Sequence, residues 1–131
     1  MIGLDTNVLV RFFAQDDRMQ SPKADRVMAS LSSTEPGWVG IATLVELAWV
    51  LRTSSRLDRH GVGQVLNHLL TREEIVVEQA DLVEVALRLY RKGNSDFADC
   101  LIACSARAAG CSRTVTFDRR AARDAGMELI N

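Results

Sequence analysis

Short strand-like runs alternate with helical segments along the whole chain, and this alternation is what most constrains the fold. Apolar residues are continuous in the runs, and between the runs they recur at helical spacing. The expected strands cover residues 1–4, 37–41, 74–78, 113–117 and 127–130. Strands that alternate with helices pair in parallel, because each crossover returns the chain to the same end of the sheet. The sequence therefore predicts an α/β fold of three layers, with a mainly parallel central sheet flanked by helices.

Helix starts and ends are marked by capping residues and glycines. Ser21, followed by Pro22, has the pattern of an N-cap with proline at the first helical position. Thr43 and Glu46 have the S/T-x-x-E spacing of a capping box. Asp58 and Ser95 are the caps expected for two later helices. The expected helices are the segment after Asp5, 21–31, a segment from Thr43, a segment from Asp58, 80–91, a segment from Ser95 to Gly110, and 118–125.

Length and charge indicate one domain without an extended charged arm. The 131 residues are 47% hydrophobic and carry a formal net charge of -1. A chain of this length buries a sizeable core, so we expect a single domain over residues 1–131. Because charges of both signs are interspersed, any nucleic-acid contact must depend on local patches.

Cysteine usage predicts a reduced, cytoplasmic protein. The three cysteines are an odd number, and we find neither a signal-peptide h-region nor an apolar run of transmembrane length. Cys100 and Cys104 lie four residues apart with no histidine nearby in sequence, which favours buried small side chains over a zinc site. We therefore expect no membrane contact.

Acidic residues fall where an open α/β sheet places its functional crevice, at the carboxyl ends of the strands. Asp5 ends the first strand, and Glu46 lies near the start of the helix after the second. Asp118 follows the fourth strand, and Asp96 and Asp99 open the helix before that strand. Acids from distant parts of the sequence could thus share one pocket.

A shared pocket of carboxylates requires a compensating charge. Unit charges about 4 Å apart repel by roughly 4 kcal/mol at an effective dielectric near 20. A hard divalent cation relieves this repulsion, and Mg²⁺ or Mn²⁺ suits oxygen ligands without Cys or His. Each acid also has a structural alternative: an N-cap for Asp118, turn chemistry for Asp5, a capping box for Glu46, and a helix-dipole contact for Asp96 or Asp99.

The sequence lacks the motifs of several families that bind nucleotides or transfer phosphate. Asp5 after an N-terminal strand is typical of haloacid-dehalogenase-type phosphatases, but Asn7 stands where their second Asp is needed. Receiver domains use a late Lys, and no Lys follows Lys92. The phosphate loop and the dinucleotide fingerprint are both absent.

Four motifs together resemble one family. They are Leu4-Asp-Thr-Asn-Val-Leu9, Val45-Glu46-Leu47, Asp96-Phe-Ala-Asp-Cys-Leu-Ile-Ala103 and Thr116-Phe-Asp118. In order and spacing they resemble the PIN-domain ribonucleases, and in chain size the VapC-type toxins of prokaryotic toxin–antitoxin pairs. The resemblance covers essentially the whole chain and implies the three-layer PIN-like fold.

The resemblance implies a site built on an acidic quartet, Asp5, Glu46, Asp99 and Asp118. Asp5 and Asp99 are then the principal Mg²⁺ ligands, with Mn²⁺ as a substitute, while Glu46 and Asp118 complete or orient the metal shell. Asp96 is an additional acid found in many relatives. The polar residues that the resemblance implies as supports of the carboxylates are Thr6, Asn7 and Thr116.

The implied activity is endonucleolytic hydrolysis of single-stranded RNA by a water that one or two Mg²⁺ ions activate. The implied partners are a small antitoxin and a second copy of the chain, with Trp49, Leu51 and Phe13 as candidate apolar contacts. The candidate RNA contacts are Arg11, Arg119 and Arg120, together with Arg52 and Arg113. Two alternatives remain: a metal-dependent phosphatase or phosphotransferase, and a PIN-like binding module without catalysis.

Overall fold

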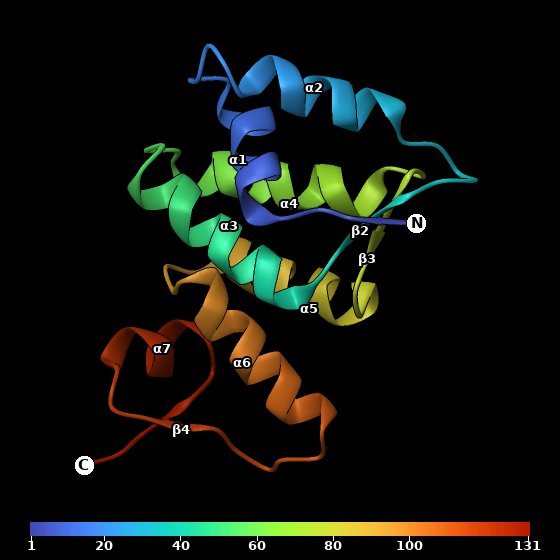
Figure 1. Ribbon diagram of the computed structural model, residues 1–131. Coiled ribbons are helices and arrows are strands. Elements are labelled where there is room, and N and C mark those ends of the chain that lie inside the picture. Colours follow the sequence, from blue (N-terminus) through green and yellow to red (C-terminus); the bar gives the residue numbers. More distant parts are fainter. The chain divides into compact units, whose positions relative to one another are not determined.

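The computed structural model describes residues 1–131 and divides them into two compact units. The first unit is Met1–Glu78 and the second is Gln79–Asn131. Each contains its own parallel sheet and its own helices (Figure 1).

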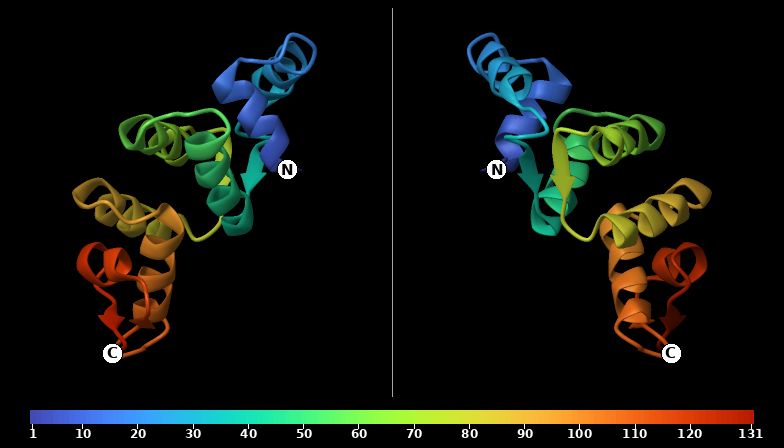
Figure 2. Two further views of the ribbon diagram at one scale, coloured as in Figure 1. Left: turned by 90° about the vertical axis from the view of Figure 1, so that its left-hand side faces the viewer. Right: turned by 90° about the vertical axis from the view of Figure 1, so that its right-hand side faces the viewer.

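The first unit is built on a three-stranded parallel sheet. Its elements are β1 (Ile2–Gly3), α1 (Thr6–Ala14), α2 (Ser21–Ser30), β2 (Gly37–Val39), α3 (Ile41–Thr53), α4 (Arg59–Thr71) and β3 (Ile75–Val77). The strand order is β1-β2-β3, and Gly37 of β2 is in register with Ile2 on one side and Ile75 on the other. The arrows of β2 and β3 lie side by side in the right-hand view of Figure 2.

The helices of this unit bury the apolar stripes that the sequence pattern indicated. Helix α1 packs against α2 and α3, and α4 packs against α3 and β3. Leu9, Leu47 and Leu66, from α1, α3 and α4, have no exposed surface. Burying such a side chain stabilises a fold by about 1.5–3 kcal/mol, so these stripes supply the main favourable term.

The second unit has a smaller parallel sheet. Its elements are α5 (Ala80–Lys92), α6 (Phe97–Ala108), β4 (Val115–Thr116), α7 (Arg119–Asp124) and β5 (Glu128–Leu129). Helices α5 and α6 pack along each other, and β4 pairs with β5 in parallel. A cluster of small side chains, Ala103, Ala121 and Ala125, packs with Met127 between α6 and α7.

The predicted α/β class is confirmed, with every expected strand and helix present and all strand pairs parallel. Asp58 caps α4 as expected, because its carboxylate accepts the Gly61 N–H at 2.7 Å. Gly110 and Gly126 end α6 and α7 with φ of 97° and 74°, the left-handed region that glycine enters without strain. The single domain over residues 1–131 stays a prediction.

The predicted N-cap at Ser21 is wrong. Gln20 is the N-cap of α2 and Ser21 is the first helical residue. The Ser21 hydroxyl donates instead to the carbonyl of Arg11 at 2.9 Å, and the side chain is buried. A long-range acceptor in α1 therefore outweighs the local capping role.

The cysteines are all free, and two of them are buried as predicted. Cys100 and Cys104 lie in the core side of α6, and burial raises the pKa of the Cys104 thiol. Cys111, for which the sequence makes no such prediction, is exposed beyond the end of α6. No helix combines the length and apolar character that a membrane crossing requires.

The cap of α4 offers a test of the fold. We expect Asp58→Ala to lower the free energy of unfolding by about 1 kcal/mol, because the Gly61 N–H loses its acceptor. Asp58→Asn keeps an oxygen acceptor and should change stability by less than about 0.5 kcal/mol. Urea unfolding of both variants measures the difference, and equal losses would contradict the capping role.

Candidate active site

Asp5 is placed by the pairing of β1 with β2. The Leu4 N–H donates to the carbonyl of Trp38 at 2.9 Å, which fixes the backbone immediately before Asp5. Asp5 is the N-cap of α1, and its Oδ1 accepts the Thr6 N–H at 2.9 Å. The residue is exposed, and its Oδ2 accepts no hydrogen bond within the chain, so this oxygen can take a ligand.

Glu46 is not part of a capping box. Helix α3 begins at Ile41 rather than at Thr43, and its N-cap is Gly40. Glu78, at the end of β3, accepts the Ile41 N–H at 2.8 Å, so a tertiary contact replaces the local cap. Glu46 is exposed and its carboxylate forms no hydrogen bond or ion pair within the chain, which removes the capping explanation for this acid.

Three further acids lie in the second unit. Asp96 is the N-cap residue of α6, although its side chain makes no capping hydrogen bond, and Asp99 lies in the first turn. Asp118 caps α7, because its Oδ1 accepts the N–H groups of Arg120 at 2.8 Å and Ala121 at 3.2 Å. The structural alternative for Asp118 is thus real, but it occupies only one of the two carboxylate oxygens.

The charges of these three acids interact. Burial of the Asp99 carboxyl raises its pKa above the usual range, and the negative charges of Asp96 and Asp118 raise it further. Within neither unit do three Cys, His, Asp or Glu side chains stand in an arrangement that would by itself hold a metal ion. Asp99 is therefore a carboxylate that a nearby cation would stabilise.

Ser95 has a role that the sequence did not indicate. It was expected to cap α6, but Asp96 is the N-cap residue. The buried Ser95 hydroxyl donates to the carbonyl of Arg120 in α7 at 3.0 Å. This bond joins the residue before Asp96 to the first turn of the helix that Asp118 caps, so it fixes the spacing of the two acidic segments.

The same turn is attached to α7 a second time. Asp124 accepts the Asn94 N–H at 3.2 Å, and Arg123 donates to both Asp124 oxygens. These contacts lower the pKa of the Asp124 carboxyl, and the hydrogen bond from the Arg123 guanidinium has the largest effect. A Cβ on Gly93 would lie 2.9 Å from the Cβ of Asp124, so only glycine allows this approach.

Two of the three expected supporting residues, Thr6 and Thr116, form hydrogen bonds with the acids that involve backbone N–H groups. Thr6 is buried, and its N–H donates to Asp5. The Thr116 hydroxyl accepts the Asp118 N–H at 3.0 Å. Asn7 is exposed and makes no hydrogen bond to an acid within the chain.

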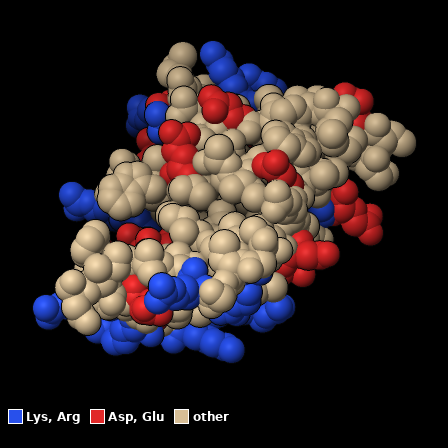
Figure 3. Space-filling model, turned by 90° about the horizontal axis from the view of Figure 1, so that it is seen from below, with Lys and Arg blue, Asp and Glu red and all other residues tan.

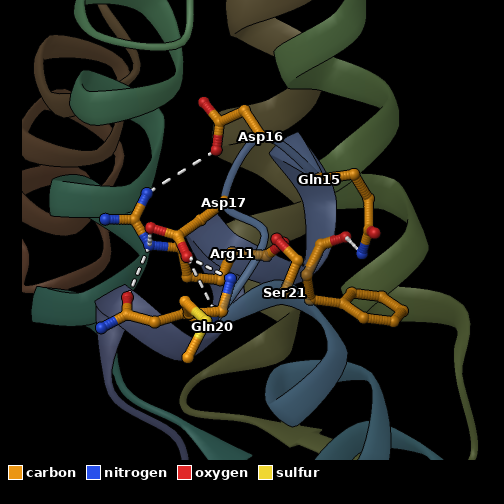
Figure 4. Close-up of polar contacts among 8 residues, drawn as sticks. Arg11, Gln15, Asp16, Asp17, Gln20 and Ser21 are labelled. Carbon is orange, nitrogen blue, oxygen red and sulfur yellow. Dashed lines mark hydrogen bonds and ion pairs between the residues drawn. The ribbon is translucent and has the colours of Figure 1, made fainter.

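Arg11, a candidate RNA contact, is held inside the first unit. Its Nε donates to the Gln20 carboxamide oxygen at 2.7 Å, and the guanidinium pairs with Asp16 at 3.6 Å and Asp17 at 3.9 Å (Figure 4). These contacts hold the turn between α1 and α2. Arg11 therefore has a structural role that competes with the expected contact to RNA.

The other candidate arginines divide into two groups. Arg52 donates to the Leu57 carbonyl at 3.0 Å, and Arg113 pairs with Glu128 at 2.8 Å. Arg119 and Arg120, beside Asp118, are exposed and form no ion pair within the chain. In Figure 3, Lys and Arg side chains are densest along the lower edge of the view, and others lie at its upper and left margins among Asp and Glu.

Comparisons with known proteins cover almost the whole chain. The family model of the PIN domain matches residues 2–126. A VapC ribonuclease from Aquifex aeolicus (strain VF5) is 27% identical over 130 residues, which are 98% of this chain and 94% of that protein. No solved structure matches the chain significantly.

The Ser95 bridge is testable through stability. Ser95→Ala removes the buried hydroxyl that donates to the Arg120 carbonyl, so the free energy of unfolding should fall by about 1–2 kcal/mol. Ser112→Ala, an exposed serine in the same unit, should change it by less than about 0.5 kcal/mol. Urea unfolding compares the two, and equal stabilities would contradict the bridge.

The raised pKa of Asp99 predicts how stability depends on pH. Because the folded state binds this proton more tightly than the unfolded state, the carboxyl lowers stability as pH rises from the usual Asp pKa through the raised one. In EDTA, Asp99→Asn should therefore melt above the wild type at neutral pH, and the difference should vanish in acid.

Thermal unfolding across this pH range tests the expectation. Asp81→Asn is the matched control, since Asp81 also lies in the first turn of a helix but is exposed. A melting difference between Asp99→Asn and the wild type that is independent of pH would show that the substitution acts through packing.

Proposed function

Because the chain belongs to the PIN-domain family, we propose that it is a metal-dependent endoribonuclease that cleaves single-stranded RNA. We further propose that it is the toxin of a toxin–antitoxin pair. The observation that carries the proposal is the family match over residues 2–126, because that range contains all four acids of the quartet. The ribonuclease named among its relatives supports the choice of RNA as substrate.

The donor set fits a hard divalent cation. Every proposed ligand is a carboxylate, and the cysteines of α6 are buried on its core side. The burial of Asp99 beside Asp96 and Asp118 adds a reason for a cation, because the ionised form of Asp99 is otherwise disfavoured. Mg²⁺ is the ion that we propose, with Mn²⁺ as a substitute.

Each acid has a proposed role that its local contacts permit. Asp5 and Asp99 hold the ion, and Glu46 and Asp118 complete or orient its shell. Asp118 can do so through Oδ2, since Oδ1 already accepts the N–H groups of α7. Asp96 adds charge beside Asp99. The convergence of Asp5 and Glu46 with the acids of the second unit is part of this proposal.

The chemistry is phosphodiester hydrolysis. When bound, Mg²⁺ lowers the pKa of a water that attacks phosphorus and stabilises the charge on the leaving 3′-oxygen. The backbone N–H groups that hold Asp5 and Asp118 keep the carboxylates oriented. Arg119 and Arg120 are the exposed cations beside Asp118 that can contact RNA phosphates.

We propose two protein partners, a small antitoxin and a second copy of the chain. Among the candidate apolar contacts, Trp49 on α3 is 61% exposed, whereas Leu51 is 1% exposed and belongs to the core. Phe13 is half-buried and packs edge-on against His68 at a ring distance of 5.5 Å. Trp49 is therefore the contact that we retain. We also propose a cytoplasmic location, since the proposed substrate is RNA.

The metal mechanism predicts a divalent-ion requirement that depends on two acids. We expect the purified chain to cleave single-stranded RNA with Mg²⁺ or Mn²⁺ and not in EDTA. Asp5→Asn and Asp99→Asn should each remove cleavage without unfolding the domain, because each loses a ligand but relieves repulsion. Gel analysis of an RNA panel, with circular dichroism of each variant, measures both effects.

Two controls accompany this experiment. The exposed Asp81→Asn variant should cleave at the wild-type rate, and a phosphatase assay on a small phosphomonoester should show no activity. Full cleavage in excess EDTA, or wild-type rates in both Asp5→Asn and Asp99→Asn, would overturn the metal mechanism. Phosphatase activity without RNA cleavage would favour a phosphatase, and neither activity would favour a binding module.

Substitution of Glu46 distinguishes the effect of its charge on cleavage from any effect on stability. Since Glu46 makes no capping contact, Glu46→Gln should change the free energy of unfolding by less than about 0.5 kcal/mol. A neutral amide is a poor ligand for Mg²⁺, so cleavage should slow by roughly tenfold or more. Single-turnover cleavage at saturating Mg²⁺ measures this, and a wild-type rate would reduce the quartet to three acids.

A further inference from the structure

The second unit contains a trough along the seam between α5 and α6. Its larger hollow has a volume of about 640 Å³ and is lined by residues from Gln79 to Val85 on one side and by Cys104, Arg107 and Ala108 on the other. A second hollow of about 220 Å³ continues toward the end of α5, and Val85, Cys104 and Arg107 line both. All of these residues belong to the second unit, so the α5–α6 trough is formed within that unit alone.

The larger hollow is mainly apolar. Leu82 and Val85 lie about one turn apart on α5, and Cys104 and Ala108 lie about one turn apart on α6. Val85 is 41% exposed, so part of this apolar surface is open to water. Transfer of apolar side chains from water into such a hollow is favourable. The lining therefore suits the apolar side chains of a ligand.

The smaller hollow is cationic. It is lined by Arg88 and Lys92 of α5 and by Arg107 of α6, and no acid belongs to its lining. The three cations are exposed and take part in none of the ion pairs within the chain. Asp124 directly precedes a lining residue in sequence, but Arg123 already pairs with it. Three positive charges without an intramolecular partner therefore meet at one end of the trough.

The trough also has a length and a polarity. From Asp81 to Lys92, α5 extends about 16 Å, or about three turns, since a helix rises about 1.5 Å per residue. Asp81 is the acid of the lining, and it lies at the opposite end of α5 from Lys92. A complementary ligand therefore carries apolar groups along about three helical turns and negative charge at the Lys92 end.

We infer that the α5–α6 trough binds an amphipathic helical segment of a partner protein that carries acidic side chains at one end. The apolar face of the segment fills the larger hollow, and its acids pair with Arg88, Lys92 and Arg107. A groove between helices receives an amphipathic helix in this manner. Charge complementarity carries the inference, because the cations of the smaller hollow have no acid of the chain as a partner. The inference goes beyond the proposed function and does not depend on RNA cleavage.

A competition between two peptide pools tests the charge of the ligand. Both pools are helical peptides of about 12 residues with varied apolar residues at i, i+3, i+4 and i+7, and one end carries glutamates in the first pool and lysines in the second. The immobilised full chain should retain the glutamate pool at least about tenfold over the lysine pool. The formal net charge of the chain is -1, so overall charge does not favour this result. Mass spectrometry of the retained peptides measures the ratio.

Charge reversal in the smaller hollow should reverse the preference. Arg88→Glu combined with Lys92→Glu replaces two of its cations with acids, so the lysine pool should then be retained over the glutamate pool. The matched control is Lys23→Glu combined with Arg26→Glu, which changes the net charge equally at exposed positions of α2 outside the trough. This control should keep the wild-type preference.

The apolar hollow is tested separately. Val85→Asp places a charge in the larger hollow and should lower retention of the glutamate pool by at least about tenfold. Ile102→Asp is the matched control, because Ile102 is 54% exposed on α6 and lines neither hollow. It should retain the pool as the wild type does. Circular dichroism checks the fold of each variant, and the charge-reversal pair decides the outcome if Val85→Asp does not fold.

Several results would overturn the inference. These are equal retention of the two pools by the wild type, an unchanged preference after reversal of Arg88 and Lys92, and equal effects of Val85→Asp and Ile102→Asp. Dimerisation that Val85→Asp abolishes, without peptide retention, would identify a second copy of the chain as the occupant. Weaker binding of single-stranded RNA by the charge-reversal variant, again without peptide retention, would identify an RNA contact instead. RNA cleavage by the wild type tests the ribonuclease proposal independently of all these results.

Discussion

Repulsion between carboxylates is the constraint on which the second unit depends. The Asp99 carboxyl is partly withdrawn from water, and the charges of Asp96 and Asp118 act on it in the same direction. This repulsion by itself favours separation of the segments that carry the three acids. Instead, the Ser95 hydroxyl and the Asp124 carboxylate attach the turn before α6 to α7. These bonds offset the repulsion without neutralising it, as a cation site requires.

Asp5 is held by a different means that has the same effect. The strand before it pairs with β2, and the N–H that follows it orients one carboxylate oxygen. Asp118 is likewise oriented by backbone donors. In both cases the helix N-terminus satisfies one oxygen and leaves the other, so a structural cap and a metal ligand are compatible roles for one side chain. The structural and functional interpretations of these acids are not exclusive.

The order and type of the elements could be predicted from the sequence, whereas their ends could not. Apolar periodicity depends on which face is buried, and it indicated every strand and helix. Caps depend on which acceptor is nearest in space. Glu78 replaces the Thr43–Glu46 box, Arg11 takes the Ser21 hydroxyl, and Arg120 takes that of Ser95. All three partners are distant in sequence, so no local pattern could indicate them.

The same limit applies to the cations, because the intramolecular partners of an arginine are also set by the fold. A guanidinium presents several donors in a fixed plane, so it can bridge Gln20, Asp16 and Asp17 at once, as Arg11 does. An ammonium on a flexible stem is less suited to such a bridge and stays hydrated. Position in the sequence favoured Arg11 because it lies near Asp5. Its intramolecular partners show instead that it holds the α1–α2 turn, a role that depends on residues brought together only by folding.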